Sequence, residues 1–211
     1  MFRDTLTESQ QTLLELLSRI VEVRTFYLAG GTALALHLGH RRSRDFDFFR
    51  AEPFVPQDLL GSLRAAGDIQ VLQEAAGTVT VILCSVPTSF FHYDYPLLRP
   101  LQQSPWNLQL ADPEDIAAMK LSALAGRGSR KDFVDLYVYA QEVAPLERVF
   151  ERFRTKYRGI RVDPYHLLRS LTFFEDANEE AMPDMLRPIG WEEIKAFFRA
   201  EATRLFRALQ G

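Results

Sequence analysis

The chain has 211 residues, of which 47% are hydrophobic and 25% charged, so it can bury a proper core as one large domain or two smaller ones. The formal net charge of −3 excludes a uniformly basic nucleic-acid-binding surface, and any contact with nucleic acid must therefore be a local patch. The single cysteine, Cys84, can form no internal disulfide, which fits a reducing compartment. No apolar run approaches the roughly 18–20 residues that span a bilayer, and the N-terminus does not resemble a signal peptide, so we expect a cytoplasmic protein without a membrane partner.

The first half of the sequence alternates between helical and β-prone segments. Apolar spacing and turn residues predict helices over about 7–21, 32–38 and 56–66, and strands over about 25–29, 45–49, 69–75, 78–85 and 90–93. Gly39 stands where a helix C-terminal stop is expected. The predicted sheet is confined to about the first 100 residues.

The second half changes character and is predicted to be helical. Asp112-Pro113 is a strong helix start, and this helix should end near Gly126. Ser129 should cap the next helix, with Asp132 at its third position, and further helices are predicted over about 145–157, 163–176 and 190–208. The fold class is therefore α+β, with a small mixed sheet in the N-terminal half followed by a helical bundle. We place the domains at 1–105 and 106–211.

Two short elements in the first half could together hold a metal-bound nucleotide. Gly30, Gly31 and Thr32 lie between a strand and a helix, where backbone N–H groups can bind phosphate and the Thr hydroxyl can cap the helix or donate to phosphate. Asp45 and Asp47 alternate along a strand and should point to the same side. Two adjacent carboxylates repel each other unless a cation such as Mg²⁺ lies between them and the phosphates. The competing interpretation is a solvated strand edge that pairs with neighbouring arginines.

These residues resemble a known family. The stretch FYLAGGTALALHLGHRRSRDFDFF (26–49) is similar to the first motif of the AbiEii/AbiGii-type nucleotidyltransferases, which belong to the polymerase-β-like superfamily and include toxins of toxin–antitoxin and phage-defence systems. The stretch IAAMKLSALAGRGSRKDFVDL (116–136) resembles the later Lys and Lys-Asp-x-x-Asp-Leu motifs of the same family. The resemblance covers about residues 10–140 and implies a nucleotidyltransferase core whose helical domain contributes to the active-site cleft.

The resemblance implies roles for the helical residues. Lys120 and Asp135 become catalytic candidates beside Asp45 and Asp47, the two metal ligands. The expected nucleotide-binding residues are Gly30, Gly31, Thr32, Arg127 and Lys131. Lys120 and Arg127 are seven residues apart and share a helix face, from which they could neutralise phosphate charge. Asp132 and Lys131 have structural alternatives, a capping box and an i,i+4 ion pair with Asp135.

The expected activity is transfer of a nucleoside monophosphate from an NTP, with Mg²⁺ and possible use of Mn²⁺, to a hydroxyl of a tRNA-like RNA or of a protein. A cognate antitoxin is expected by analogy. No carboxylate lies between Thr78 and His92, where many polymerase-β-like enzymes place a third one, so a nucleotide-binding module without turnover stays open. A sugar-nucleotide transferase would need a nucleotide-binding sheet before the Asp-x-Asp, and a Rossmann fold would need a third glycine. The sequence therefore favours neither of these two alternatives.

Two further patterns have plain alternatives. The basic run of residues 152–161 could grip a nucleic-acid backbone, but a solvated helix face accounts for it as well. The aromatic pairs at 90–91, 173–174 and 197–198 are expected in the core rather than as base-stacking platforms. The four histidines have no metal-ligand spacing, so zinc is not expected.

Overall fold

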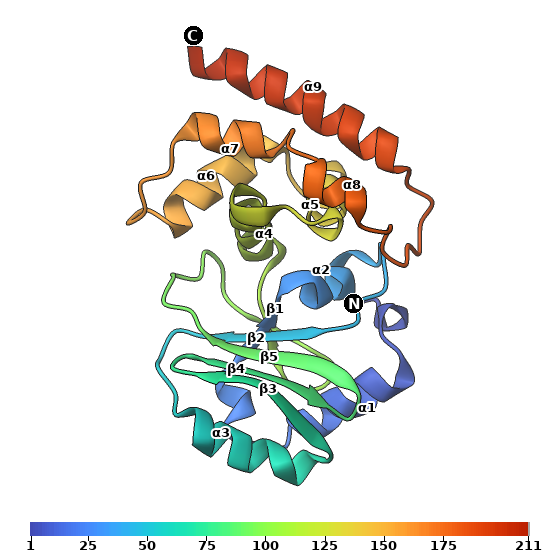
Figure 1. Cartoon of the computed structure of the whole chain (residues 1–211), viewed down its shortest axis with the longest axis vertical. Coiled ribbons are helices and arrows are strands. Elements are labelled where there is room, and N and C mark those ends of the chain that lie inside the picture. Colours follow the sequence, from blue (N-terminus) through green and yellow to red (C-terminus); the bar gives the residue numbers. More distant parts are fainter. Residues whose placement is uncertain (211) are drawn as a thin grey trace. The chain divides into compact units, whose positions relative to one another are not determined.

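A computed structural model describes residues 1–210, which divide into two compact units that meet in the sequence between Asp112 and Pro113. The first unit contains all the strands, and the second is made of helices (Figure 1). This arrangement confirms the predicted α+β fold class. Within residues 1–210 no helix is long and apolar enough to cross a membrane.

The sheet of the first unit is mixed, with the strand order β3-β4-β5-β2-β1-β7-β6. β1 runs antiparallel to β2 and parallel to β7, while β2 runs parallel to β5. The strand bounds are β1 Tyr27–Ala29, β2 Phe46–Arg50, β3 Ile69–Ala75, β4 Thr78–Leu83, β5 Val86–His92, β6 Gln102–Gln103 and β7 Gln109–Leu110. The prediction that the sheet stops near residue 100 is wrong, because β6 and β7 add to its edge through a pairing that local sequence does not encode.

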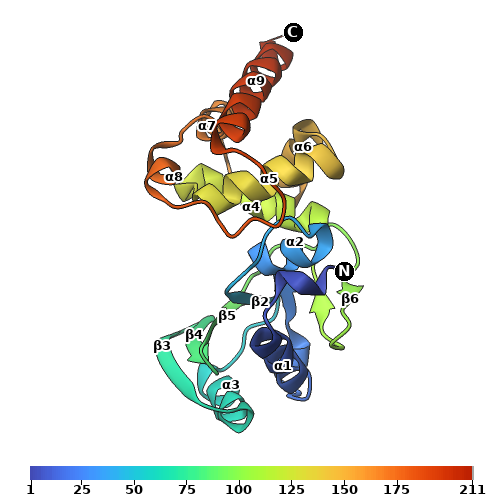
Figure 2. The same cartoon turned by 90° about the vertical axis from the view of Figure 1, so that its right-hand side faces the viewer.

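Three helices cover the sheet of the first unit. Figures 1 and 2 show α1 and α3 on one side of the strands and α2 on the other. Their bounds are α1 Glu8–Leu17, α2 Gly30–Leu38 and α3 Pro56–Leu63, with short 3-10 turns at Arg3–Thr5, Val23–Thr25 and Arg64–Ala66. α1 begins with a capping box between Thr7 and Gln10 and ends four residues earlier than predicted. The alternating burial of β2 and β4 places one row of side chains in the core and leaves the other row half-exposed.

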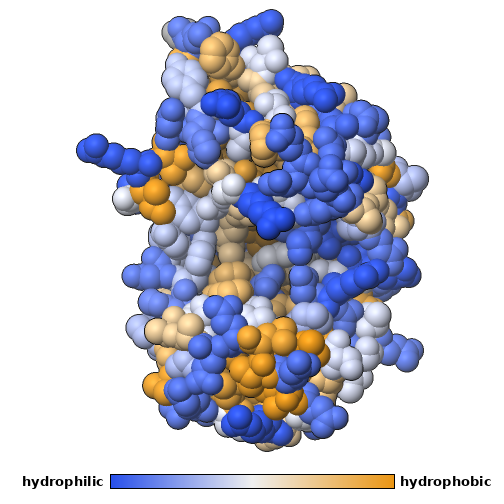
Figure 3. All heavy atoms as spheres, viewed as in Figure 1, coloured by the Kyte–Doolittle hydropathy of each residue, from blue (hydrophilic) through white to orange (hydrophobic). Residues whose placement is uncertain are grey.

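The core of this unit is aromatic along the central strands. Phe46, Phe48 and Phe90 are fully buried, and the rings of Phe48 and Phe90 stack at 5.0 Å across the β2–β5 pair. At the sheet edge, by contrast, β3 leaves Val71 and Leu72 exposed. Figure 3 shows a hydrophobic patch on the N-terminal unit amid a mostly hydrophilic surface.

The helical unit contains six α-helices within the described residues. Their bounds are α4 Pro113–Arg127, α5 Arg130–Glu142, α6 Leu146–Lys156, α7 Pro164–Ser170, α8 Glu175–Glu179 and α9 Trp191–Gln210. The single helix predicted over 163–176 is wrong, because a turn at Leu171–Phe174 separates α7 from α8. Each pair of aromatic residues expected in the core is split: Phe90, Phe174 and Phe198 are buried, whereas their neighbours are not.

Acidic residues in the first turn of α4 hold α6 in place. Lys156 donates to Asp115 over 2.7 Å, and neither side chain is exposed. Arg152 pairs with Glu114 at 2.8 Å. Two cations of the basic run therefore serve the packing of α6 on α4, whereas Arg154, Arg158 and Arg161 are exposed, so a solvated face describes only part of the run.

Candidate active site

Strand pairing brings the glycine turn and the second aspartate together. Ala29, the last residue of β1, lies opposite Asp47 of β2 in the antiparallel register. Gly30 follows with φ +63°, a left-handed conformation that glycine adopts without strain. A Cβ atom on Gly30 would lie 2.7 Å from Oδ2 of Asp47, so the carboxylate rests directly against the backbone of the turn. The two motifs thus form one local structure.

The glycine turn opens α2, whose N-terminus has no side-chain cap. The helix is buried almost throughout, including Gly31 and Thr32, and ends at Gly39, as the sequence predicted, with this residue in the left-handed conformation. The first backbone N–H groups of a helix have no intrahelical acceptor, and the helix dipole favours an anion there. The turn beside Asp47 can therefore bind a phosphate through its backbone.

The Thr32 hydroxyl supports the loop that leads into β2. It donates to the backbone carbonyl of Asp45 and lies 2.7 Å from the hydroxyl of Ser43. Ser43 in turn lies 3.4 Å from Oδ1 of Asp45. Since Thr32 is only 1% exposed, its role in this structure is to fix the position of Asp45.

The loop itself is anchored to α1. The buried side-chain amide of Gln10 donates to the carbonyl of Ser43 over 2.9 Å, and the Ser43 amide donates to the carbonyl of Thr5 over 3.1 Å. Sequence reasoning did not assign Ser43 a role. The signal that could have found it is a small polar residue that stands among Arg41, Arg42 and Arg44, two positions before the first aspartate.

The alternation of β2 places Asp47 on the half-exposed face, away from buried Phe46 and Phe48. Asp45 immediately precedes the strand and is also half-buried. Phe49 shares the face of Asp47 and stacks on Tyr27 at 6.1 Å, so it does not join the other two phenylalanines in the core.

The strand beside β2, β5, has a serine at a position where a third carboxylate could have stood. In the parallel β2–β5 pair, Asp47 lies opposite Ser89, whose hydroxyl is 3.3 Å from that of Thr80. In residues 1–210 no group of three or more His, Cys, Asp or Glu side chains is arranged to hold a metal. Two carboxylates beside a phosphate-binding turn nevertheless suit Mg²⁺, which takes a few carboxylates and completes its coordination with substrate oxygens and water.

The predicted residues of the helical unit form a second cluster. Lys120 on α4 lies between two carboxylates of α5, with its Nζ 2.7 Å from Oδ1 of Asp132 and 2.7 Å from Oδ2 of Asp135. All three residues are buried, and Asp135 is 0% exposed. Asp132 also accepts from the backbone N–H and hydroxyl of Ser129, which confirms the predicted capping box.

The two other predicted cations differ from Lys120 in their surroundings. α4 does continue to Arg127, as the shared helix face of Lys120 and Arg127 requires. Arg127 and Lys131 are both exposed, one at the end of α4 and the other in the first turn of α5. An anionic ligand can therefore reach both side chains at the surface, whereas Lys120 is buried among carboxylates.

Comparison with known proteins agrees with this geometry. The family described as "Nucleotidyl transferase AbiEii toxin, Type IV TA system" matches residues 12–90 and 85–209. An uncharacterised protein of Aquifex aeolicus is 37% identical over 201 residues, which is 92% of this chain and 94% of that protein.

Two solved structures share the fold. MenT4, a nucleotidyltransferase toxin of Mycobacterium tuberculosis, superposes with a TM-score of 0.63 at 18% identity, over 92% of this chain and 80% of that one. An H. pylori protein described as a candidate nucleotidyltransferase superposes with a TM-score of 0.58 at 19% identity, over 96% of this chain and 94% of that one. The family match extends over nearly the whole chain and includes both motif clusters, so this chain belongs to the AbiEii family of nucleotidyltransferase toxins.

Proposed function

We propose that the protein transfers a nucleoside monophosphate from an NTP to a hydroxyl group of a tRNA-like RNA, with a protein hydroxyl as the alternative acceptor. The observation that carries the proposal is the contact between Gly30 and the carboxylate of Asp47. Because of this contact, a helix N-terminus that can bind phosphate and a carboxylate that can bind a metal lie close enough to act on the same substrate.

The reaction is an in-line displacement at the α-phosphorus. The acceptor oxygen forms a bond to phosphorus, the bond from phosphorus to the α–β bridging oxygen breaks, pyrophosphate leaves with the electron pair, and the hydroxyl proton passes to water. Such a transfer depends mainly on positioning and charge stabilisation, so a strong general base is not required.

Each predicted residue has a proposed role in this reaction. Asp45 and Asp47 hold the metal, and Gly30 and Gly31 direct backbone N–H groups to the phosphates. A bound Mg²⁺, for which Mn²⁺ can substitute, offsets the charge of the carboxylates and the phosphate oxygens. Thr32 fixes the position of Asp45 relative to the glycine turn. The helical unit contributes Lys120 and Asp135 as catalytic candidates and Arg127 and Lys131 as contacts to the nucleotide.

The test is incubation of the purified protein with Mg²⁺, total tRNA and each NTP in turn, labelled with ³²P at either the α or the γ position. We expect label from one α-labelled NTP on RNA, none from the γ-labelled NTP, and loss of transfer in Asp45→Asn/Asp47→Asn. Label from the γ position would indicate a kinase and contradict the proposal. Label on the protein would identify the alternative acceptor.

A nucleotide-binding module without turnover remains the second candidate, because Ser89 stands opposite Asp47 where a carboxylate could have completed the site. Isothermal titration with Mg²⁺ and NTP separates the two. Binding that depends on Asp45 and Asp47, without transfer to RNA or protein, would support the module.

The family also leads us to propose toxicity and a cognate antitoxin. Induced expression of the wild-type chain should arrest growth of a bacterial host, and Asp45→Asn/Asp47→Asn should not. Co-expression of the adjacent gene should restore growth. Equal growth inhibition by both variants would contradict toxicity through nucleotidyl transfer.

A further inference from the structure

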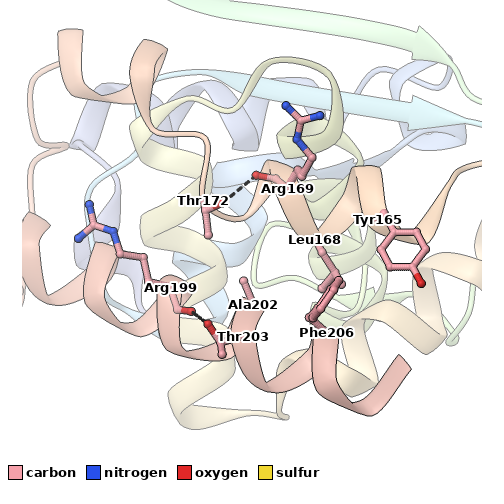
Figure 4. Close-up of a pocket in the computed structure, with 8 residues that line it drawn as sticks. All are labelled: Tyr165, Leu168, Arg169, Thr172, Arg199, Ala202, Thr203 and Phe206. Carbon is pink, nitrogen blue, oxygen red and sulfur yellow. Dashed lines mark hydrogen bonds between the residues drawn. The ribbon is translucent and has the colours of Figure 1, made fainter. Parts of the chain in front are cut away.

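The helical unit contains a cleft between α7 and α9 that the proposed reaction does not use. Its volume is about 500 Å³, and its walls include Tyr165, Leu168 and Arg169 from α7 and Arg199, Ala202 and Phe206 from α9. Figure 4 shows the rings of Tyr165 and Phe206 next to each other, with Arg199 at the opposite end of the cleft. The ring centroids of Tyr165 and Phe206 are 5.9 Å apart.

A second cleft adjoins the first and leads to a residue of the predicted nucleotide site. It has a volume of about 390 Å³ and shares Arg169 with the first cleft. Its walls include Arg127, at the end of α4, together with His166 and Phe173. His166 is fixed there by a 2.8 Å hydrogen bond between Nε2 and the carbonyl of Ala125. The two clefts thus connect Arg127 with Arg199 along one unit of the protein.

The three arginines of these clefts differ from the cations of the helical unit that are paired with carboxylates. Arg152, Arg187 and Arg204 are held by glutamates. In the described part of the chain, no carboxylate lies within 4 Å of the guanidinium groups of Arg127, Arg169 or Arg199. Asp176 lines the second cleft but forms no ion pair with them. The clefts therefore offer positive charge that the protein itself does not neutralise.

Exposed aromatic rings gather in the same clefts. Tyr165 is 49% exposed, Phe173 51% and Phe206 40%. Among residues 1–210, Phe2 is the only other aromatic side chain of comparable exposure. Aromatic rings exposed beside unpaired guanidinium groups are the combination that binds single-stranded nucleic acid, in which bases stack on the rings and the backbone phosphates follow the cations.

We propose that these two clefts bind a single-stranded segment of the acceptor RNA, with bases on Tyr165, Phe173 and Phe206 and phosphates on Arg169 and Arg199. The inference rests on the proposed function and names where its acceptor is held. An acidic protein segment would use the arginines but would gain little from the three rings, so the observations favour RNA.

Fluorescence anisotropy with a 5′-labelled 12-nucleotide single-stranded RNA tests this surface without relying on turnover. The full chain carries Asp45→Asn/Asp47→Asn to prevent transfer, and three variants are made in that background. These are Arg169→Gln/Arg199→Gln, Tyr165→Ala/Phe206→Ala, and the matched control Arg207→Gln. Arg207 is exposed on α9 and lines neither cleft.

The arginine variant should bind at least about tenfold more weakly, and the slope of log K against log salt should decrease by about 1.4, which corresponds to two lost phosphate contacts on a single strand. The aromatic variant should bind at least about fivefold more weakly with an unchanged salt slope. Arg207→Gln should match the parent, and a duplex of the same sequence should bind more weakly than the single strand. Circular dichroism confirms that each variant is folded.

Wild-type affinity and salt slope in the arginine variant would overturn the inference. Loss of RNA binding in the arginine variant but not in the aromatic variant, with full competition by polyphosphate, would identify a general polyanion site and would also contradict it. The transfer assay separates this inference from the proposed function. If Arg169→Gln/Arg199→Gln labels RNA with an unchanged KM for RNA, the binding surface alone is refuted. If the protein binds RNA but never labels it, the RNA acceptor alone is refuted.

Discussion

Gly30→Ala tests the contact on which the candidate active site depends. The φ of +63° at this position costs an alanine about 1–2 kcal/mol relative to a relaxed backbone. The new Cβ would lie 2.7 Å from Oδ2 and 3.3 Å from Cβ of Asp47, closer than ordinary van der Waals contact. The carboxylate must therefore move by several tenths of an ångström or more, and displacements approaching 1 Å in an active site cost roughly 100-fold in rate. We expect nucleotidyl transfer to fall by about that factor.

Gly39→Ala is the matched control, because Gly39 has the same φ of +63° at the other end of α2. A Cβ there would meet the ring of Phe2, which is 46% exposed and can move into solvent. Both variants should lose a similar free energy of unfolding in urea, about 1–2 kcal/mol. Only Gly30→Ala should lose transfer activity and Mg²⁺-dependent NTP binding, measured by label transfer and by isothermal titration.

Comparison of the two variants tests whether nucleotidyl transfer depends on the contact between Gly30 and Asp47. Equal activity of folded Gly30→Ala and Gly39→Ala would mean that the Asp47 carboxylate can leave the glycine turn without consequence, and the reasoning from this contact would be wrong. Equal loss of activity in both would attribute the effect to α2 as a whole.

Three predictions concern stability, measured by urea unfolding. Lys156→Met should destabilise the chain by about 3–5 kcal/mol because it leaves Asp115 charged and buried, whereas Lys156→Met/Asp115→Leu should recover most of that loss; equal losses would contradict the pairing. Burial lowers the pKa of His37 below 6.5, so the unfolded chain binds more protons than the folded one. The free energy of unfolding should therefore fall as the pH drops below about 6.5. His37→Gln should show a shallower fall, and a pH profile identical to that of the wild type would refute this. The hydrogen bond from Arg204 lowers the pKa of Glu147, so their interaction should be lost as the pH falls below about 4.5. Because both side chains are exposed, a double-mutant cycle should give a coupling energy of at most about 1 kcal/mol at pH 7, which decreases with added salt. A larger coupling energy would contradict this account.

Local patterns predicted most of the elements around the candidate site. β3 has the predicted bounds, and the helix stop at Gly39 and the cap at Ser129 were both readable from residue types with specific backbone roles. The errors arose where tertiary contacts decide. β7 is two residues long and exists because it pairs with β1, some 80 residues away, which no local signal reports.

The candidate site was predictable in its residue types but not in its contacts. The sequence placed carboxylates on one strand and glycines before one helix, but the spacing could not show that Asp47 touches Gly30. It also could not show that the Thr32 hydroxyl turns toward Ser43 and Asp45. Such contacts depend on the β1–β2 register, which is set by the whole core and not by the motif.

The charges of the helical cluster limit what Lys120 can do for a triphosphate. One ammonium lies between two carboxylates, so Lys120, Asp132 and Asp135 together carry a formal charge of −1. A buried cation held in this way mainly permits its carboxylates to stay ionised, because removing it would leave two like charges close together in a medium of low dielectric constant. The positive charge that the helical unit can offer to phosphates must then come from other side chains. Arg127 meets that requirement, since it is exposed, has no carboxylate within 4 Å in the described chain, and lies on the same helix as Lys120. In this structure Lys120 is therefore better suited to position Asp135 than to neutralise the substrate.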